Sequence, residues 1–298
     1  MSDPGRSRFI GGRSVLGECP VWDVRASALY WVDIDSHTVH RWDSMTDDVS
    51  SHLVGGRPGS IALTSDSGVL LVAIERSLVL LDWGTGVCTT HLDLPISDPE
   101  IRLNDGRVDR AGDFWVGSMH VPSLDRQPIG SLYRVRGDWT ATEELTGIRV
   151  SNGLAFPPDG RSMYFADTAE LVIRRYARDA AGGLSEPEAF ADFARLGLPG
   201  KPDGGCVDAQ GGYWIACVRG SAIARLTADG RVDQLVTVPF RRPTCIAFGG
   251  PDLSTLFVTS IGGGGGYEMY EDEPDAGRVM ALDVGFTGLP EGVFATRR

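Results

Sequence analysis

A short unit recurs six times along the 298 residues of this chain, and this repeat constrains the fold more than any other feature. Each unit has a short apolar strand, a turn rich in Asp and Gly, and a second apolar strand that usually carries an aromatic residue. The units begin at Cys19, Ser60, Asp105, Asn152, Asp203 and Thr244. Most are followed by a third alternating strand. Several strands about every 45 residues predict an all-β fold, a six-bladed β-propeller.

Two other all-β arrangements are the alternatives, a β-sandwich and a pair of smaller β domains. Neither explains six matching units, and no linker of low-complexity composition divides the chain. We therefore predict that residues 1–298 form a single propeller domain with little helix. We also expect the N-terminal segment to pair into the blade built from the C-terminal repeat.

Charge and composition exclude several classes of partner. The net charge is −12 and no run of Lys or Arg is present, which argues against nucleic acid. No stretch approaches the roughly 20 apolar residues that span a bilayer, and the N-terminus lacks the apolar core of a signal peptide. Five cysteines without a CxxC pair are typical of reduced thiols. We predict a cytoplasmic protein without nucleic-acid or membrane partners; the sequence does not predict its oligomeric state.

One position in each unit opens the first strand, and equivalent positions in a propeller lie on a ring around the central axis. These positions hold Glu18, Ser60, Asn104 (or Asp105), Asn152, Asp203 and Thr244. Every one of these side chains has an oxygen atom that binds a cation or accepts a hydrogen bond. A strand that opened into an apolar core would more often begin with Val or Ile.

Glu18, Asn152 and Asp203 form a set of hard oxygen ligands on this ring. Such a set suits Ca²⁺, Mg²⁺ or Mn²⁺, and Zn²⁺ also accepts carboxylates. Two carboxylates balance the charge of one divalent cation, and water would fill the remaining coordination positions. The pattern predicts a central metal site. The alternative for each residue is a structural role in capping strand ends and turns.

Four stretches resemble one protein family. They are GECPVWD around Glu18, RLNDGRVDRAGDFWVGSM from Arg102, SNGLAFPPDG around Asn152 and KPDGGCVDAQGGYWIA around Asp203. In them the chain resembles the regucalcin/gluconolactonase (senescence marker protein-like) family of six-bladed propellers, from about Gly17 into the last blade.

The resemblance implies a set of roles. Glu18, Asn152 and Asp203 match the family's metal ligands, and Arg102 and Asn104 match its substrate contacts. It implies a divalent-metal-dependent lactonase that hydrolyses an aldonolactone, such as gluconolactone, xylonolactone or arabinonolactone, to the aldonic acid. The chain departs from the family pattern at Cys19, where many members have Ser, and in the segment HVPSLDRQP after Met119, which leaves the sugar preference open.

Three further residues or segments are functional candidates. We hypothesise that Asp203 also acts in catalysis, accepting a proton from the attacking water and returning it to the ring oxygen. His120 is a candidate substrate contact near the pocket mouth, with a solvated loop histidine as the alternative. The segment Gly262–Gly277 begins with five consecutive glycines. It is a candidate lid, with a solvated strand connection as the alternative.

Two other functions fit the same sequence. One is a propeller hydrolase that acts on another ester or on a biosynthetic intermediate. The other is a non-catalytic Ca²⁺-binding propeller, because repeat folds often serve as platforms. A serine or cysteine nucleophile is not predicted, since the chain has no GxSxG motif and neither Cys206 nor Cys217 has a histidine nearby in sequence.

Overall fold

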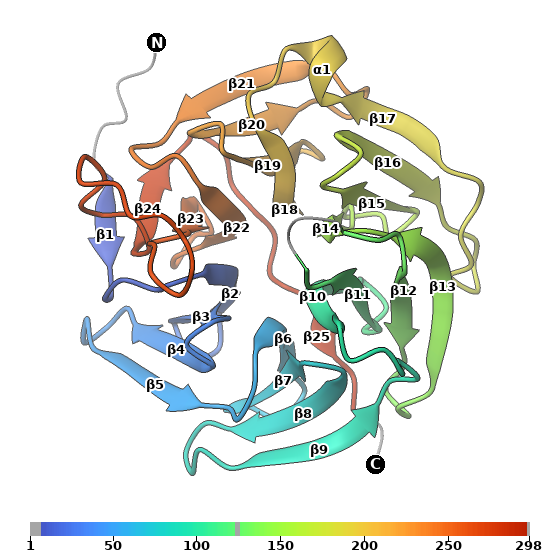
Figure 1. Ribbon diagram of the computed structural model, residues 1–298, viewed down its shortest axis with the longest axis horizontal. Helices are drawn as coiled ribbons and strands as arrows, with labels where there is room; N and C mark the ends of the chain where they lie inside the picture. The colour runs from blue at the N-terminus through green and yellow to red at the C-terminus, as the bar shows by residue number, and fades with distance from the viewer. Residues whose placement is uncertain (1–6, 123–125, 297–298) are drawn as a thin grey trace.

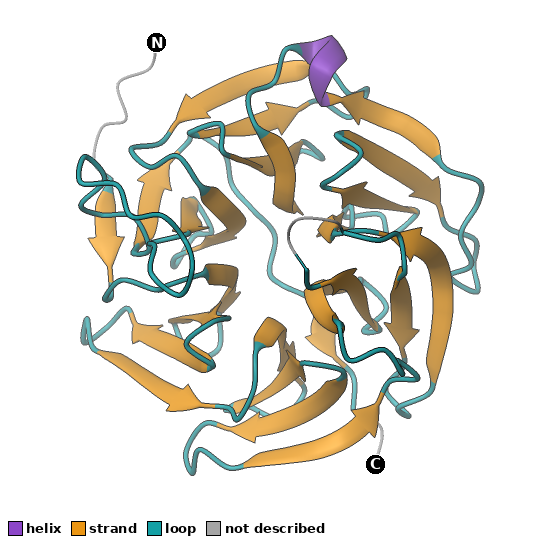
Figure 2. Ribbon diagram, viewed as in Figure 1, coloured by secondary structure: helices purple, strands orange, loops and turns teal. Residues whose placement is uncertain are grey.

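The computed structural model describes residues 7–122 and 126–296, which form six antiparallel sheets arranged in a ring (Figure 1). The predicted six-bladed β-propeller is confirmed. Strands dominate, and the helix found in the described residues is the single short turn α1 (Phe193–Leu196) at the outer edge (Figure 2). None of the helices in this part of the chain has the length and apolar character that a membrane crossing requires.

The first three blades follow one another in chain order. Blade 1 consists of β2 (Gly17–Asp23), β3 (Ala28–Asp33), β4 (Thr38–Asp43) and β5 (Val49–Leu53). Blade 2 consists of β6 (Pro58–Thr64), β7 (Val69–Ile74), β8 (Ser77–Asp82) and β9 (Cys88–Asp93). Blade 3 consists of β10 (Ile101–Val108), β11 (Phe114–His120), β12 (Gly130–Val135) and β13 (Ala141–Ile148).

The remaining blades complete the ring. Blade 4 consists of β14 (Ser151–Ala155), β15 (Ser162–Asp167), β16 (Val172–Ala177) and β17 (Glu188–Asp192). Blade 5 consists of β18 (Lys201–Val207), β19 (Tyr213–Val218), β20 (Ala222–Leu226) and β21 (Val232–Thr237). Blade 6 consists of β22 (Pro243–Gly249), β23 (Thr255–Ser260) and β24 (Val279–Asp283), with β1 (Arg8–Ile10) as its outermost strand.

Each blade is covered on both faces by its neighbours, so its second strand is buried along nearly its whole length. The strand β3 is buried at every residue, whereas the outermost strand β5 is largely exposed. Hydrophobic clusters fill the spaces between adjacent blades all around the ring. The five cysteines are free thiols, and Cys206 and Cys217 are buried in the core.

Both ends of the chain close the ring. The strand β1 pairs antiparallel with β24, with Arg8 opposite Ala281 and Ile10 opposite Val279, which confirms the predicted pairing of the N-terminal segment. A second closure was not predicted. The short strand β25 (Val293–Phe294) pairs in parallel with β6, the innermost strand of blade 2.

The segment between β24 and β25 crosses the central channel, where Figure 1 shows it in red. This segment contacts the C-terminal ends of the inner strands. Its Glu291 carboxylate forms a buried ion pair of 2.8 Å with Arg107 of β10, and Gly288 donates a backbone hydrogen bond to Leu253 of blade 6. Two cavities of about 10 Å³ remain beside this ion pair, room for roughly one water each. The segment therefore closes one end of the channel.

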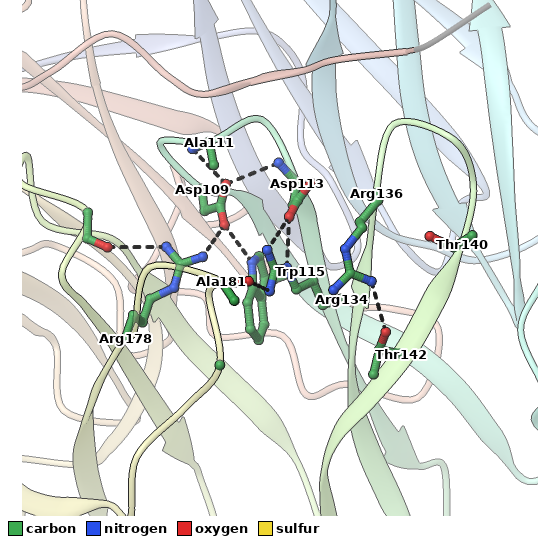
Figure 3. Close-up of polar contacts among 12 residues, drawn as sticks. Asp109, Ala111, Asp113, Trp115, Arg134, Arg136, Thr140, Thr142, Arg178 and Ala181 are labelled. Atoms are coloured by element: carbon green, nitrogen blue, oxygen red, sulfur yellow. Dashed lines mark hydrogen bonds and ion pairs between the residues drawn. The ribbon is translucent and has the colours of Figure 1, made fainter.

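A buried aspartate at the end of β10 ties blade 3 to blade 4 (Figure 3). The Asp109 carboxylate accepts hydrogen bonds from the indole of Trp115 at 2.9 Å and from the backbone of Ala111 and Asp113. It also forms an ion pair with Arg178 of blade 4. In blade 5, Asp208 likewise accepts from the indole of Trp214, but its arginine partner, Arg225, lies on β20 of the same blade. The Asp–Trp contact thus recurs in blades 3 and 5, and the contact to the next blade is made by Asp109.

We predict that Asp109→Ala destabilises the fold by about 3–5 kcal/mol, because it leaves the buried Arg178 guanidinium without its partner. Urea denaturation measures the free energy of unfolding. Asp48→Ala is the control, since Asp48 is an exposed turn residue and its loss should cost about 0.5 kcal/mol or less. Equal effects of the two substitutions would contradict the assigned role of Asp109.

Candidate active site

Every innermost strand has a break in its pairing register, at the place where the sequence predicts the ring of polar residues. The breaks lie at Glu18/Val21, Pro58/Ser60, Leu103/Gly106, Asn152/Ala155, Pro202/Gly205 and Pro243/Ile246. A β-bulge leaves residues out of the ladder and redirects their side chains. Glu18 and Asn152 are the last paired residues before the break, whereas Asn104 and Asp203 lie within it, so the repeated bulges place all four at the same level of the ring.

Local backbone geometry explains two of these bulges. Cys19 and Gly153, which follow Glu18 and Asn152, both have positive φ, 44° and 67°. Glycine reaches this region without steric cost. At position 153 a Cβ atom would also lie 2.7 Å from the hydroxyl oxygen of Tyr213, which donates a hydrogen bond to the Gly153 carbonyl. Cys19 adopts the same conformation with a side chain, whose sulfur accepts a hydrogen bond from Ile61.

The two predicted carboxylate ligands come from blades 1 and 5 and influence each other. Burial, and after it the negative charge of Asp105, raise the pKa of Glu18 to about 8. Burial also raises the pKa of Asp203 well above its usual range, together with the charges of Glu18 and Asp105. Such coupling requires proximity. The fold thus gathers three carboxylates from different blades in the channel.

The third predicted ligand, Asn152, is held by a chain of hydrogen bonds. Its amide nitrogen donates to the Thr168 hydroxyl at 2.7 Å, and that hydroxyl donates to the Pro202 carbonyl at 2.8 Å. This contact fixes which way the Asn152 amide points and leaves its oxygen available. The sequence analysis did not find Thr168. Only its position could have indicated it: Thr168 directly follows β15, the strand that pairs with the strand of Asn152.

The residues fit a divalent cation. Within the described residues no hydrogen-bond donor contacts the Asp203 carboxylate, and the Glu18 carboxylate accepts from the backbone of Cys19, at 3.1 Å, and from the weakly donating Cys245 thiol. Buried carboxylates with so few donors need a positive charge. The described residues contain no group of three or more His, Cys, Asp or Glu side chains that could hold a metal. The candidate set is therefore two carboxylates and an amide, all hard oxygen ligands.

Arg102 and Asn104 lie beside this set on β10. The Arg102 guanidinium is buried and donates to the Asn104 side-chain oxygen at 2.7 Å. The Asn104 amide donates in turn to the Ser151 carbonyl and, at 3.3 Å, to the Asn152 side-chain oxygen. The structure thus brings the two predicted substrate contacts together with one predicted metal ligand.

The structure excludes two simpler roles for these residues, a surface arginine and a turn. Arg102 is 7% exposed, so it is not a surface arginine. The Asn-Asp-Gly triplet at 104–106 does not form a turn but lies inside the strand β10. Asp105 is buried there and accepts a hydrogen bond from the backbone of Leu154 in blade 4. A bulge in a strand and a turn favour the same residue types, so the triplet alone does not distinguish the two.

His120 ends β11 and is buried, so it is not a solvated loop residue. One ring nitrogen accepts a hydrogen bond from the backbone of Gln127, and the other lies 3.5 Å from the Glu100 carboxylate. These contacts hold the connection between β11 and β12, of which residues 123–125 lie outside the described residues. A direct contact of His120 with substrate stays a prediction.

The glycine-rich segment 262–277 belongs to blade 6 but reaches other blades. Tyr267 is half-buried and packs against the core between blades 1 and 2. Burial raises the pKa of Tyr267, as do the charges of Asp35 and Glu18, while Arg102 opposes this. Tyr267 therefore lies near the open end of the channel, as a lid would require. Opening and closing of the segment stay a prediction.

We predict that, without a divalent cation, the protein loses stability as pH rises from about 5 to 8. The pKa of Glu18 rises from 4.5 to about 8 on folding, so in this window the folded protein keeps a proton that the unfolded chain has released. The free energy of unfolding then falls, by at most about 1.4 kcal/mol per pH unit for one such group. A bound cation replaces the proton and should remove the decline.

Urea denaturation at pH 5, 6.5 and 8, with chelator or with excess cation, measures this effect. Asp203→Asn should flatten the decline in chelator, because it removes a second carboxyl group whose pKa is raised on folding, by burial and by the charge of Glu18. Parallel stability curves with and without cation would contradict the predicted metal site.

The profile of the SMP-30/Gluconolactonase/LRE-like region matches residues 16–262. The chain is 39% identical to 6-deoxy-6-sulfogluconolactonase of Pseudomonas putida (95% of this chain, 96% of the relative). It is 34% identical to L-arabinolactonase of Azospirillum brasilense (95% and 93%). The crystal structure of a calcium-binding protein, regucalcin, from Agrobacterium tumefaciens superposes with a TM-score of 0.87 at 31% identity (96% and 97%). The chain belongs to the SMP-30/gluconolactonase/LRE-like family.

Proposed function

We propose that this protein is a divalent-metal-dependent lactonase that hydrolyses a small sugar lactone to its aldonic acid. One observation carries the proposal. Buried carboxylates that repel one another, including Glu18 and Asp203, lie beside the buried Arg102 guanidinium. This is an anionic site for a cation next to a donor for substrate oxygen atoms. The names of two similar proteins, a sulfogluconolactonase and an arabinolactonase, support a lactone as substrate.

Glu18, Asn152 and Asp203 would hold one cation, of which Ca²⁺, Zn²⁺, Mn²⁺ and Mg²⁺ are the candidates. The all-oxygen set favours the hard cations among these. When bound, such a cation polarises the lactone carbonyl and makes a neighbouring water more acidic. The C-terminal segment closes the far end of the channel, so substrate enters from the end where the inner strands begin.

The chain's own residues then have three tasks. Arg102 and Asn104 orient the sugar ring through hydrogen bonds to its oxygen atoms, and His120 holds the connection beside them. Asp203 accepts a proton as the water oxygen attacks the carbonyl carbon. It returns this proton to the ring oxygen as the carbon–oxygen bond of the ester breaks, which yields the free acid. The raised pKa of Asp203 makes it a stronger base than an exposed aspartate, whereas a bound cation acts in the opposite direction.

We predict that acid release from gluconolactone, xylonolactone or arabinonolactone stops with chelator and returns with one of the four cations. Asp203→Asn should lower kcat about 100-fold or more, because general acid–base catalysis contributes about that much. A pH-indicator assay measures the rate, with Asp192→Asn as the matched control. Asp192 caps the distant helix α1, and asparagine caps equally well.

The outcomes distinguish the alternatives. Cation binding without acid release from any lactone would indicate a non-catalytic propeller. Acid release from simple esters but not from lactones would indicate another hydrolase. An Asp203→Asn variant that binds the cation and keeps full kcat would show that Asp203 is not the proton acceptor.

A further inference from the structure

Two guanidinium groups occupy neighbouring positions on blade 3 at the open end of the channel. Arg102 lies on β10, directly opposite Met119 of β11 in the antiparallel ladder. Arg126, in the connection after β11, is half-buried, and one of its guanidinium nitrogens lies 3.7 Å from the Met119 sulfur. Met119 therefore separates the two arginines by a single side chain, and they form one cationic patch.

Among the described residues, neither arginine of this patch forms an ion pair. Arg107, Arg134, Arg178 and Arg225 each pair with a buried or partly buried carboxylate, whereas the buried Arg242 donates only to the Glu268 backbone carbonyl. Among the described residues, Arg102 donates only to the Leu103 carbonyl and the Asn104 side chain, and Arg126 contacts only the Met119 sulfur. A charge withdrawn from water without a partner costs free energy. A ligand that brings the missing negative charge would recover it.

The surrounding charges leave this patch positive. Arg57 is neutralised by Glu75 at 3.0 Å. The half-buried Asp35 carboxylate interacts with both Arg102 and Arg57, so it balances one charge. Glu18 and Asp203 also face Arg102, and Asp203 and Asp167 face Arg126. A cation held by Glu18 and Asp203 would neutralise those two, and the Asp167 carboxylate already accepts hydrogen bonds from the backbone of Arg149 and Val150. Burial lowers the pKa of Arg102 to about 10, and at neutral pH the guanidinium stays protonated.

We propose that Arg102 and Arg126 bind an anionic group carried by the lactone away from its ester, a sulfonate, phosphate or carboxylate, and so select charged sugar lactones over neutral ones. This inference rests on the proposed lactonase activity and names its substrate class. Guanidinium groups donate paired hydrogen bonds to such oxyanions. With the lactone carbonyl at the Glu18–Asp203 side of the channel, the anionic end of the sugar lies toward Arg126.

The test compares kcat/KM for four substrates with saturating cation: gluconolactone, 6-phosphogluconolactone, 6-deoxy-6-sulfogluconolactone and a lactone of glucaric acid. The expected result for the unmodified protein is a preference of about tenfold or more for at least one charged lactone. The three charged substrates show which anionic group is recognised. Raising the ionic strength should reduce the preference, since salt screens partly exposed charges.

Substitutions assign the preference to Arg126. Arg126→Gln should raise KM for the charged lactone about tenfold and leave gluconolactone unchanged, while Arg126→Lys should keep part of the preference because it keeps the charge. Arg161→Gln is the matched control, since Arg161 is exposed on the turn between β14 and β15, at the opposite end of the strand from Asn152. It should alter neither rate.

Equal or faster hydrolysis of gluconolactone by the unmodified protein would overturn the inference and leave the lactonase proposal intact. So would an Arg126→Gln variant that slows charged and neutral lactones alike. If no lactone is hydrolysed, the lactonase proposal fails, and calorimetric binding still tests the patch. Binding of 6-phosphogluconate tighter than gluconate, and weakened in Arg126→Gln, would support the cationic patch; equal binding of the two acids would overturn it.

Discussion

The repulsion between carboxylates buried in the central channel is the interaction on which this account of the site depends. Glu18, Asp105 and Asp203 come from three blades; besides burial, the charge of Asp105 raises the pKa of Glu18, and the charges of Glu18 and Asp105 raise the pKa of Asp203. A fold selected only for stability would replace such a group with apolar side chains. The six-bladed ring maintains it because the blades are fixed by their own cores, and binding of the proposed cation would relieve the repulsion.

The construction of the ring explains how this arrangement is possible. Hydrophobic clusters between the blades and the Asp109 and Asp208 contacts hold the outer parts. The inner strands then carry bulges without loss of the fold, because their neighbours in each blade are fully paired. Closure of one end by the Arg107–Glu291 ion pair leaves a blind channel. The polar residues at its open end therefore meet solvent and ligands from a single direction.

The repeat and its polar ring could be predicted from sequence because both depend on local pattern. The alternation of apolar residues predicted the strands of the blades, and the matching places of Glu18, Asn152 and Asp203 in the repeat predicted the candidate ligands. The bulges could not be predicted, because a bulge and a turn favour the same residues, as the Asn-Asp-Gly triplet shows. Thr168, the C-terminal β25 and the pairing of Met119 with Arg102 depend on contacts between segments distant in sequence or on exact register. No local pattern reports these.

The most direct measurement is anomalous diffraction from crystals grown with Mn²⁺ or Ca²⁺. The account predicts one strong peak in the channel, within about 2.0–2.6 Å of oxygen atoms from Glu18, Asn152 and Asp203. A channel without a peak at saturating cation, or a peak bound by other side chains, would contradict it.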